Sequence, residues 1–506
     1  MTNNTTAKDM HETRVLGLVI AGLLALIFYN FYMSLDFVGK IVVWLCAPTL
    51  LLPALVFVWN RYSKSAREHR KRIEAIKEIP PQLLLPAPDS IYLGHDIKLK
   101  VPVHLPDHVR YRHVHIIGST GTGKTMSTVQ NFLTQDFARG YGAVILDGKG
   151  EIKFLNWLKK TIPEDKLQVF DLGDEKSLVY DPISAGSPLE AAQRLYSSFT
   201  WSEQFYASKS RTVLQIIFQK HFDLKKKNPS LKEIADYLKT PNAYTAIACS
   251  PSYPAKLATE DYTGIIGLRD QVDELCTGYL ANILSPNDRP EINLADAQNG
   301  KVIYFRLQSS LSSQIASIVG KLLINHLNFS AGTAHRNGAD GDEKPKDGKI
   351  NKSNFIPVYL DEFATFACPE FADLISKARS AGYALHFSHQ SIGDVAEVSK
   401  GFLNRITDNS ATKIVMRIND PDSADFFARS FGTTKYQKVT QRITNAADEE
   451  SAELVGEGSS RDARKYRAAP DELKSHPVGV GSVLIAHGYD APQGASSVFT
   501  VRFPVI

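Results

Sequence analysis

Cysteine is scarce in this sequence, and the four cysteines present are far apart. Cys46, Cys249, Cys276 and Cys368 form no CxxC pair and no other spacing that a metal site requires. We therefore expect reduced thiols in the cytosol or the bilayer. A large excess of one charge is also lacking, because 58 Lys and Arg face 54 Asp and Glu, and a net charge of +4 does not establish a polyanionic partner. No internal repeat of the solenoid kind is present.

Apolar runs long enough to cross a bilayer occur only within the first 75 residues, which contain two of them. Residues 15–35 form a run of 21 interrupted only by Asn30 and Ser34, and residues 41–59 form a run of 19 without a charge. At about 1.5 Å of rise per residue, each run spans roughly 30 Å as a helix, the thickness of the hydrocarbon core. A signal peptide and a buried helix are the alternatives, but no small-residue cleavage site follows the first run. We predict a two-helix transmembrane hairpin.

The segment that follows this hairpin is basic. Six Lys and Arg residues lie between positions 61 and 72, and the positive-inside rule keeps such a segment in the cytoplasm. Because only residues 36–40 join the two apolar runs, we expect a two-pass protein with both termini and the bulk of the chain in the cytoplasm.

Beyond residue 72 the pattern is that of an α/β protein. The apolar run at residues 114–117, the stretch GSTGTGKT, a helical stretch and the apolar run at residues 143–146 follow one another as strand, loop, helix and strand. That order predicts a βαβ unit with a parallel sheet. Between residues 187 and 292 the pattern becomes helical, with capping boxes that begin at Ser187 and Ser230. We interpret this block as an all-α insertion into a nucleotide-binding core.

The predicted domain organisation has four segments and one long loop. They are an N-terminus with the transmembrane hairpin (1–72), the first part of the nucleotide-binding domain (73–186), the inserted all-α domain (187–292) and the second part of the nucleotide-binding domain (293–506), with a polar loop at about 331–354.

The stretch GSTGTGKT matches the P-loop pattern, in which backbone N–H groups freed by glycine wrap phosphates at a helix N-terminus. Lys124 would reach the β- and γ-phosphates of ATP, and Thr125 would hold Mg²⁺. A glycine-rich turn without nucleotide is the alternative, but the position between a strand and a helix favours the P-loop. The residues expected to contact the nucleotide are Gly118, Ser119, Thr120, Gly121, Thr122, Gly123, Lys124 and Thr125.

A second half of the site is predicted at VYLDEF, where a buried apolar strand ends in two carboxylates. P-loop ATPases place one such carboxylate near Mg²⁺ and the other near the attacking water. We assign Asp361 to the metal and Glu362 to the catalytic base. An apolar run that ends in Asp-Glu is weak evidence alone, and the P-loop makes it strong.

The block ARSAGYALHFSHQS adds two polar residues around another predicted strand. Arg379 precedes the strand and would neutralise charge on the γ-phosphate, in its own subunit or in a neighbouring one, although an ordinary helix-end ion pair is the simpler interpretation. Gln390 ends the strand and would sense that phosphate. His386 and His389 have no predicted metal partners, so we expect structural or exposed histidines.

Together these motifs resemble the type IV secretion coupling proteins, the conjugative DNA-transfer ATPases of the TraG/TraD type. The resemblance rests on the N-terminal hairpin, GSTGTGKT, LDGKGE, the helical block, YLDEF, ARSAGYALHFSHQS and ITDNSATKIVMRINDPDSADFFARSFG, in that order. It implies a RecA-like P-loop ATPase core with an inserted all-α domain, anchored in a bacterial inner membrane as a homo-hexamer. Nucleotide would then bind between subunits, with Arg379 as an arginine finger and Arg112 as a second basic residue near the neighbour's nucleotide.

The function that the resemblance implies is an ATPase that drives relaxase-bound single-stranded DNA, with protein substrates as a second cargo, into type IV secretion channel proteins. A DNA pump is expected to contact the phosphate backbone of the DNA and not to recognise the base sequence. The alternatives are a double-stranded DNA translocase of the chromosome-segregation type and a secretion substrate receptor with little motor activity.

Overall fold

The structure is a computed structural model that describes residues 68–336, 355–443, 454–486 and 496–504, together with Met33 and Asp36. The chain divides into two compact units, residues 1–78 and residues 79–506. In the first unit, residues 68–77 form a helix. Both predicted membrane spans lie outside the described residues, as does most of the predicted polar loop. No helix among the residues that are described has the length and apolar character that a membrane crossing needs.

One mixed sheet of eleven strands forms the centre of the second unit. Its strands are β1 (Ser90–Asp96), β2 (Pro102–Pro106), β3 (Val114–Ile117), β4 (Ala143–Asp147), β5 (Leu167–Asp171), β6 (Val302–Arg306), β7 (Ile356–Asp361), β8 (Tyr383–His389), β9 (Thr412–Val415), β12 (Val480–Ala486) and β13 (Ser496–Arg502). Their order is β2-β1-β13-β12-β9-β3-β8-β7-β4-β6-β5. The strands from β9 to β5 are parallel, and β12, β13, β1 and β2 extend the sheet beyond β9 in antiparallel fashion.

The parallel strands are short apolar runs because both of their faces are covered. Every residue of β4, β7 and β8 is buried, as expected of parallel strands packed between two layers of helices. In the sheet, β8 lies between β3 and β7. The carboxyl ends of these three strands therefore meet at one edge, where the predicted nucleotide motifs begin.

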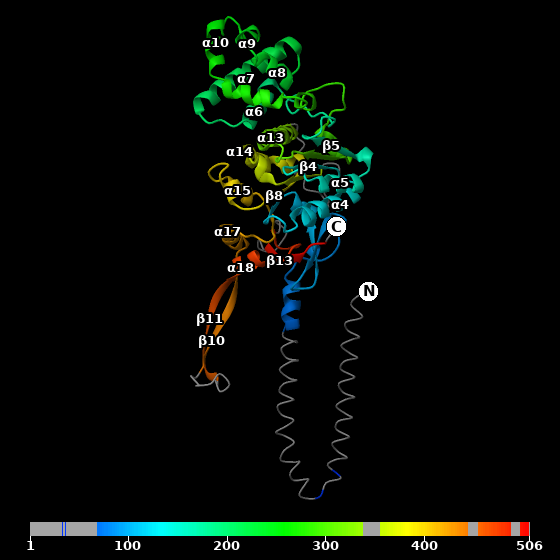
Figure 1. Cartoon of the computed structure of the whole chain (residues 1–506). Coiled ribbons are helices and arrows are strands. Elements are labelled where there is room, and N and C mark those ends of the chain that lie inside the picture. Colours follow the sequence, from blue (N-terminus) through cyan, green and yellow to red (C-terminus); the bar gives the residue numbers. More distant parts are fainter. Residues whose placement is uncertain are drawn as a thin grey trace. The chain divides into compact units, whose positions relative to one another are not determined.

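Helices and helical turns flank the first strands and fill the block between β5 and β6. Before the block they are η1 (Pro81–Leu83), α3 (Asp107–Arg110), η2 (Thr125–Gln130), α4 (Asn131–Ala138), α5 (Ile152–Thr161) and η3 (Glu164–Lys166). Within it they are α6 (Pro188–Ser198), α7 (Gln204–Lys225), α8 (Leu231–Leu238), α9 (Pro241–Ala248), α10 (Ala255–Thr263), α11 (Ile266–Leu275), α12 (Leu280–Ile283) and η4 (Leu294–Asn299). Figure 1 shows α6 to α10 gathered together.

Two capping boxes begin helices of this block, as the sequence predicts. The Ser187 side chain accepts from the Glu190 N–H, and the Glu190 carboxylate accepts from the Ser187 N–H. Ser230 and Glu233 repeat the arrangement at α8. The buried apolar side chains of α6 and α8 belong to the same apolar cluster as Val144 and Leu146 of β4 and Val358 and Leu360 of β7.

The remaining elements follow β6. They are α13 (Ser313–Arg336), η6 (Phe363–Phe366), α14 (Pro369–Lys377), η7 (Ala378–Ala381), α15 (Gly393–Ala396), α16 (Phe402–Asp408), α17 (Pro421–Phe431), the paired strands β10 (Thr433–Ile443) and β11 (Leu454–Tyr466), and α18 (Pro470–Ser475). The prediction that a polar loop begins at residue 331 is wrong, because α13 continues to Arg336. Ala331 is fully buried in the apolar cluster, and Arg336 forms an ion pair with Glu190 at 3.0 Å, so tertiary contacts extend the helix.

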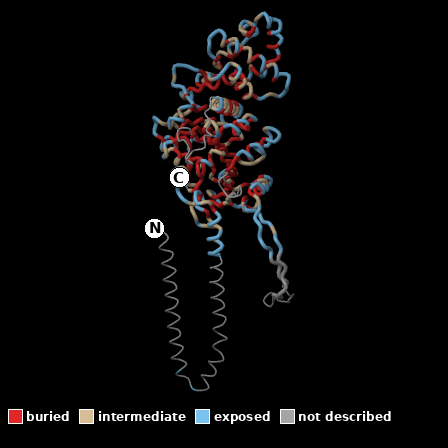
Figure 2. The backbone as a smooth tube through the Cα atoms, turned by 180° about the vertical axis from the view of Figure 1, so that it is seen from behind, coloured by how far each residue is buried: buried red, intermediate tan, exposed pale blue. Residues whose placement is uncertain are grey.

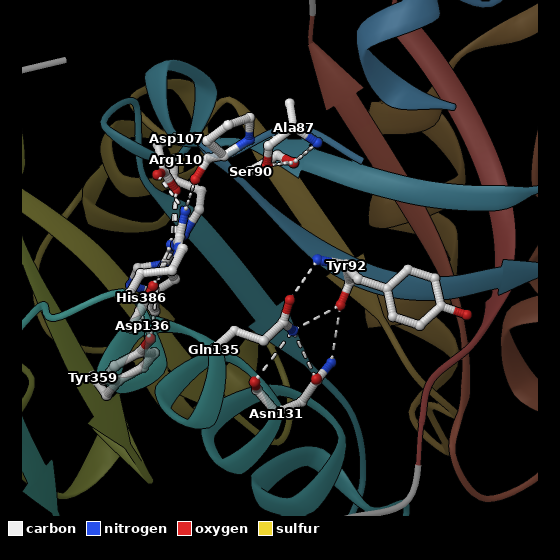
Figure 3. Close-up of polar contacts among 12 residues, drawn as sticks. Ala87, Ser90, Tyr92, Asp107, Arg110, Asn131, Gln135, Asp136, Tyr359 and His386 are labelled. Carbon is white, nitrogen blue, oxygen red and sulfur yellow. Dashed lines mark hydrogen bonds and ion pairs between the residues drawn. The ribbon is translucent and has the colours of Figure 1, made fainter. Parts of the chain in front are cut away.

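A buried polar network ties α3 and α4 to the sheet (Figure 3). The Arg110 guanidinium contacts Asp107 at 2.9 Å and Asp136 at 2.7 Å, and its Nε donates to His386 on β8 at 3.2 Å. Tyr359 on β7 donates to Asp136. Burial alone would raise the pKa of Asp136, but the nearby Arg110 outweighs burial and lowers that pKa to about 2. His386 is therefore structural, as predicted.

Candidate nucleotide-binding site

The glycine-rich stretch 118–125 connects β3 to the helix that begins with η2. Gly121 and Gly123 have φ of +75° and +91°, values that favour glycine. The helix begins with the π-helical turn η2 and continues into α4. A loop of this shape before a helix N-terminus directs its N–H groups at one point, which suits a phosphate.

Lys124 contacts the start of its own loop, and Thr125 contacts the end of β7. The Lys124 Nζ donates to the Gly118 carbonyl at 2.5 Å, and the Thr125 hydroxyl donates to Asp361 at 2.6 Å. Burial lowers the pKa of Lys124, and the nearby Glu362 and Asp361 carboxylates oppose that shift. The hydroxyl and the carboxylate are 236 positions apart in the chain.

Asp361 and Glu362 have different surroundings at the end of β7. Asp361 is 5% exposed and also accepts from the Ser388 hydroxyl on β8. Glu362 has φ of +49°, a left-handed conformation that is uncommon for a residue with a side chain and is found at functional sites. Gln390 donates to both Glu362 carboxylate oxygens at 3.1 and 3.2 Å and accepts from Thr120 at 2.8 Å. Gln390 therefore links the P-loop to Glu362.

A cavity of about 190 Å³ lies between these residues. Its lining comes from the P-loop, from the end of β7 and from the segment after β4. The lining residues are Ser119, Thr120, Gly121, Gly123, Lys124, Thr125, Met126, Asp147, Lys149, Glu151, Phe154, Asp361 and Glu362. The structure thus brings six of the predicted P-loop residues together with both predicted carboxylates.

Asp147, Lys149 and Glu151 also line this cavity, although no role is predicted for them from the sequence. Asp147 ends β4 directly opposite Asp361 at the end of β7. It accepts from the N–H groups of Lys149 and Gly150 at 3.0 and 2.7 Å and thereby holds the turn that carries Lys149 into the cavity. Lys149 forms an ion pair with Glu151. The available signal was the apolar run before Asp147, which ends in a carboxylate as the run before Asp361 does.

Arg112 and Arg379 lie at the other edge of the sheet. Arg112 precedes β3 and Arg379 precedes β8, so both are at the amino ends of parallel strands whose carboxyl ends hold the cavity. They are close enough to interact, because burial and then the charge of Arg379 lower the pKa of Arg112. Within one chain the structure does not bring either arginine to the cavity.

The oxygen atoms of Thr125 and Asp361 at the cavity suit a magnesium ion bound together with phosphate oxygens. Mg²⁺ prefers carboxylate and hydroxyl oxygens and is usually held by one or two protein groups, water and the phosphates. Thr125 and Asp361 supply such oxygens 2.6 Å apart. Among the residues that the structure describes, no cluster of three or more His, Cys, Asp and Glu could hold a metal by itself.

We expect Asp147→Asn to remove a pH dependence of stability in mildly acidic solution. Burial, and then the neighbouring Asp361, raise the pKa of Asp147 from 3.8 to about 6. Because the folded pKa is the higher one, the stability that this group contributes is full below pH 3.8 and is lost as the pH rises through about 6. The loss amounts to at most about 3 kcal/mol. Urea denaturation midpoints of both proteins between pH 4 and 7 would measure it, and parallel curves would contradict this prediction.

Comparison with known proteins places two parts of the chain in one family. A family model described as the type IV secretion-system coupling protein DNA-binding domain matches residues 100–248. A second, described as the TraM recognition site of TraD and TraG, matches residues 356–475. Together the two matches cover more than half of the chain.

The individual relatives share low sequence identity with this chain. The type 4 coupling protein DotL of Legionella pneumophila is 28% identical over 128 residues, which cover 24% of this chain and only 16% of DotL. The solved bacterial conjugative coupling protein TrwBdeltaN70 is 16% identical with a TM-score of 0.60, over 84% of this chain and 90% of that one. TrwB in complex with ADP and Mg²⁺ is 14% identical with a TM-score of 0.59, over 84% and 91%. At these identities the solved structures support the fold alone. Because both matched parts belong to models of one family and the α/β fold with its large mixed sheet is that of TrwB, the chain belongs to the type IV secretion coupling proteins.

Proposed function

We propose that this protein is a membrane-anchored ATPase that recruits relaxase-bound single-stranded DNA and drives it into a type IV secretion channel during conjugation. The observation that carries the proposal is the contact between Thr125 and Asp361, which unites the two predicted halves of an ATPase site. A complete hydrolytic site favours a motor over a receptor that needs nucleotide only for assembly. Protein substrates are a second cargo in this proposal.

In the proposed hydrolysis, the polar residues at the cavity have separate tasks. Lys124 and the N–H groups of residues 120–125 bind and orient the phosphates. Thr125 and Asp361 would hold Mg²⁺, which would supply charge neutralisation to the phosphates. Glu362 accepts the proton of the attacking water. Gln390 positions Glu362 through its two hydrogen bonds.

Lys149 supplies a second cation to the cavity in this proposal. Asp147 accepts a hydrogen bond from the Lys149 N–H. The Lys149 side chain is half-exposed and forms an ion pair with Glu151 at the cavity, and a bound phosphate would compete with Glu151 for the Lys149 ammonium. The TrwB structure that contains ADP and Mg²⁺ supports nucleotide as the ligand in a protein of this fold.

The positions of Arg112 and Arg379 support a ring of subunits, which we take to be a homo-hexamer. An arginine at the amino ends of the strands reaches a nucleotide only if the nucleotide belongs to a neighbouring chain. A head-to-tail contact of that kind generates a ring when its rotation closes. The predicted spans at residues 15–35 and 41–59 would anchor this ring in the inner membrane, with both termini in the cytoplasm.

Single-stranded DNA is expected to stimulate ATP hydrolysis by the full chain in detergent about three- to tenfold, because a motor couples hydrolysis to its track. The measurement is steady-state phosphate release with and without an oligonucleotide of mixed sequence, since backbone contacts are indifferent to base identity. Lys124→Ala supplies the background rate. Equal rates of ATP hydrolysis with and without DNA in the assembled protein would contradict the motor proposal and favour a receptor.

A further inference from the structure

The β10–β11 hairpin stands apart from the sheet. The two strands pair only with each other, in a separate two-stranded sheet. Figure 1 shows them extending from α17 and α18, and Figure 2 shows most of their described residues as exposed. We call residues 433–438 and 461–466 the shaft of the hairpin. An isolated two-stranded hairpin is marginally stable in water, so a shaft with little burial calls for a partner.

The shaft carries a net positive charge. It carries five cations and one acid, namely Lys435, Lys438, Arg461, Arg464 and Lys465 against Asp462. Two cross-strand positions place like charges directly opposite each other, Lys435 with Arg464 and Lys438 with Arg461. Like charges in such positions destabilise a hairpin. None of these four side chains forms an ion pair within the part of the chain that the structure describes.

The two repulsive pairs lie on opposite faces of the ribbon. Side chains alternate between faces along a strand, so Lys435 and Lys438, three positions apart, point in opposite directions together with their partners. The face of Lys438 also holds Tyr436, which is 39% exposed, with the Lys465 ammonium 5.9 Å from its ring. A flat anionic surface would neutralise the cations on one face of the ribbon and leave the like charges on the other face repelling each other. A groove with two anionic walls neutralises both.

The base of the shaft is held firmly and is connected to the P-loop. The Arg467 N–H donates to the Gly432 carbonyl at 3.0 Å and closes the base, while α17 and α18 pack into a small apolar cluster with the end of β9. Just before α17, the Ser119 N–H donates to the Arg417 carbonyl at 2.8 Å and the Asn419 N–H donates to the Ser119 hydroxyl at 3.0 Å. A partner on the shaft is thus joined through α17 to the nucleotide cavity.

We propose that the shaft is a docking site for double-stranded DNA, held in the major groove with cations toward both phosphate walls. That groove is about 12 Å wide and admits a two-stranded β-ribbon. This goes beyond the proposed function, whose cargo is single-stranded, and it does not depend on ATP hydrolysis. The sequence between the strands is acidic, with Asp448, Glu449 and Glu450, so the contact is assigned to the shaft and not to the tip.

The test measures binding of the full chain in detergent to a fluorescein-labelled duplex of about 30 base pairs, by anisotropy at several salt concentrations. Lys435→Gln with Arg464→Gln neutralises one face, and Lys438→Gln with Arg461→Gln neutralises the other. Each double variant removes a repulsive pair, so the hairpin is not expected to unfold. Lys159→Gln with Lys160→Gln, two exposed cations at the end of α5, is the matched control.

Each shaft variant is expected to weaken duplex binding roughly tenfold and to reduce the slope of log K against log salt by about 2, since each phosphate contact contributes about 0.9. The control should change affinity less than twofold, and basal ATP hydrolysis should be unchanged in all three. If only one of the two shaft variants weakens binding, the proposal of a groove is overturned. An equal loss of affinity for single-stranded DNA overturns it as well. Loss of binding to vesicles of anionic lipid with duplex binding intact assigns the shaft to a membrane and overturns the proposal.

Discussion

Glu362→Gln is expected to slow ATP hydrolysis about a thousandfold, within the range that loss of a general base produces. Glutamine has the shape of glutamate but cannot accept the proton of the attacking water at neutral pH. Its side chain can still pair with Gln390, which contacts both carboxylate oxygens in the native protein. The rate should therefore fall without a rearrangement of the P-loop. Single-turnover hydrolysis separates this chemical step from product release.

Nucleotide binding distinguishes this change from a loss of the site. With a fluorescent ATP analogue, Glu362→Gln should bind within about threefold of the native protein, because the lost interaction is made only in the transition state. Lys124→Ala is the matched comparison and should weaken binding as well as hydrolysis, since Lys124 is a phosphate ligand in the proposal. It should also abolish DNA transfer in cells and leave membrane insertion intact. Hydrolysis by Glu362→Gln within tenfold of native would remove Glu362 from the role of base.

The union of the P-loop with Asp361 and Glu362 could be predicted because of a general property of parallel sheets. Each motif follows a short apolar run, and the carboxyl ends of parallel strands meet at one edge, where ligands bind. Gln390 follows β8 by the same rule, and the structure places it against Glu362. The direction of the strands gives the shared edge, and the pattern of P-loop ATPases pairs the two motifs there.

Asp147 was missed because its role does depend on strand order. Its run of apolar residues has the same form as that before Asp361, but nothing local indicates that β4 pairs with β7 and brings Asp147 opposite Asp361. That pairing is set by how the helices pack on both faces of the sheet.

The β10–β11 hairpin and the end of α13 could not be predicted for related reasons. The shaft is exposed on both faces, so it lacks the alternation of apolar and polar residues that identifies a strand. The sequence at the end of α13 is polar and predicts a loop. It is helical because Ala331 is buried and Arg336 forms an ion pair with Glu190, which is distant in the chain. In each case the deciding contacts are distant in sequence.

Arg379→Ala is expected to lower ATP hydrolysis about a thousandfold, the lower end of what an arginine finger contributes. The physical reason is that a guanidinium neutralises charge that develops on the γ-phosphate in the transition state, so nucleotide affinity should change far less than the rate. Arg112→Ala is the matched control, because Arg112 lies beside Arg379 and carries the same charge. We expect that control to lose less than tenfold.

Mixing two inactive proteins decides whether Arg379 acts across a subunit boundary. Lys124→Ala keeps Arg379, and Arg379→Ala keeps Lys124, so a ring that contains both has some interfaces where an intact P-loop faces an intact arginine. If subunits exchange at random in equal amounts, about a quarter of head-to-tail interfaces are of this kind, and hydrolysis should reappear in the mixture. An arginine that acts within its own chain leaves every subunit of the mixture defective. Because the strands hold Arg379 at the edge opposite to Lys124, we expect activity to return, and a mixture as inactive as its components would refute the assignment of Arg379 to a neighbour's nucleotide.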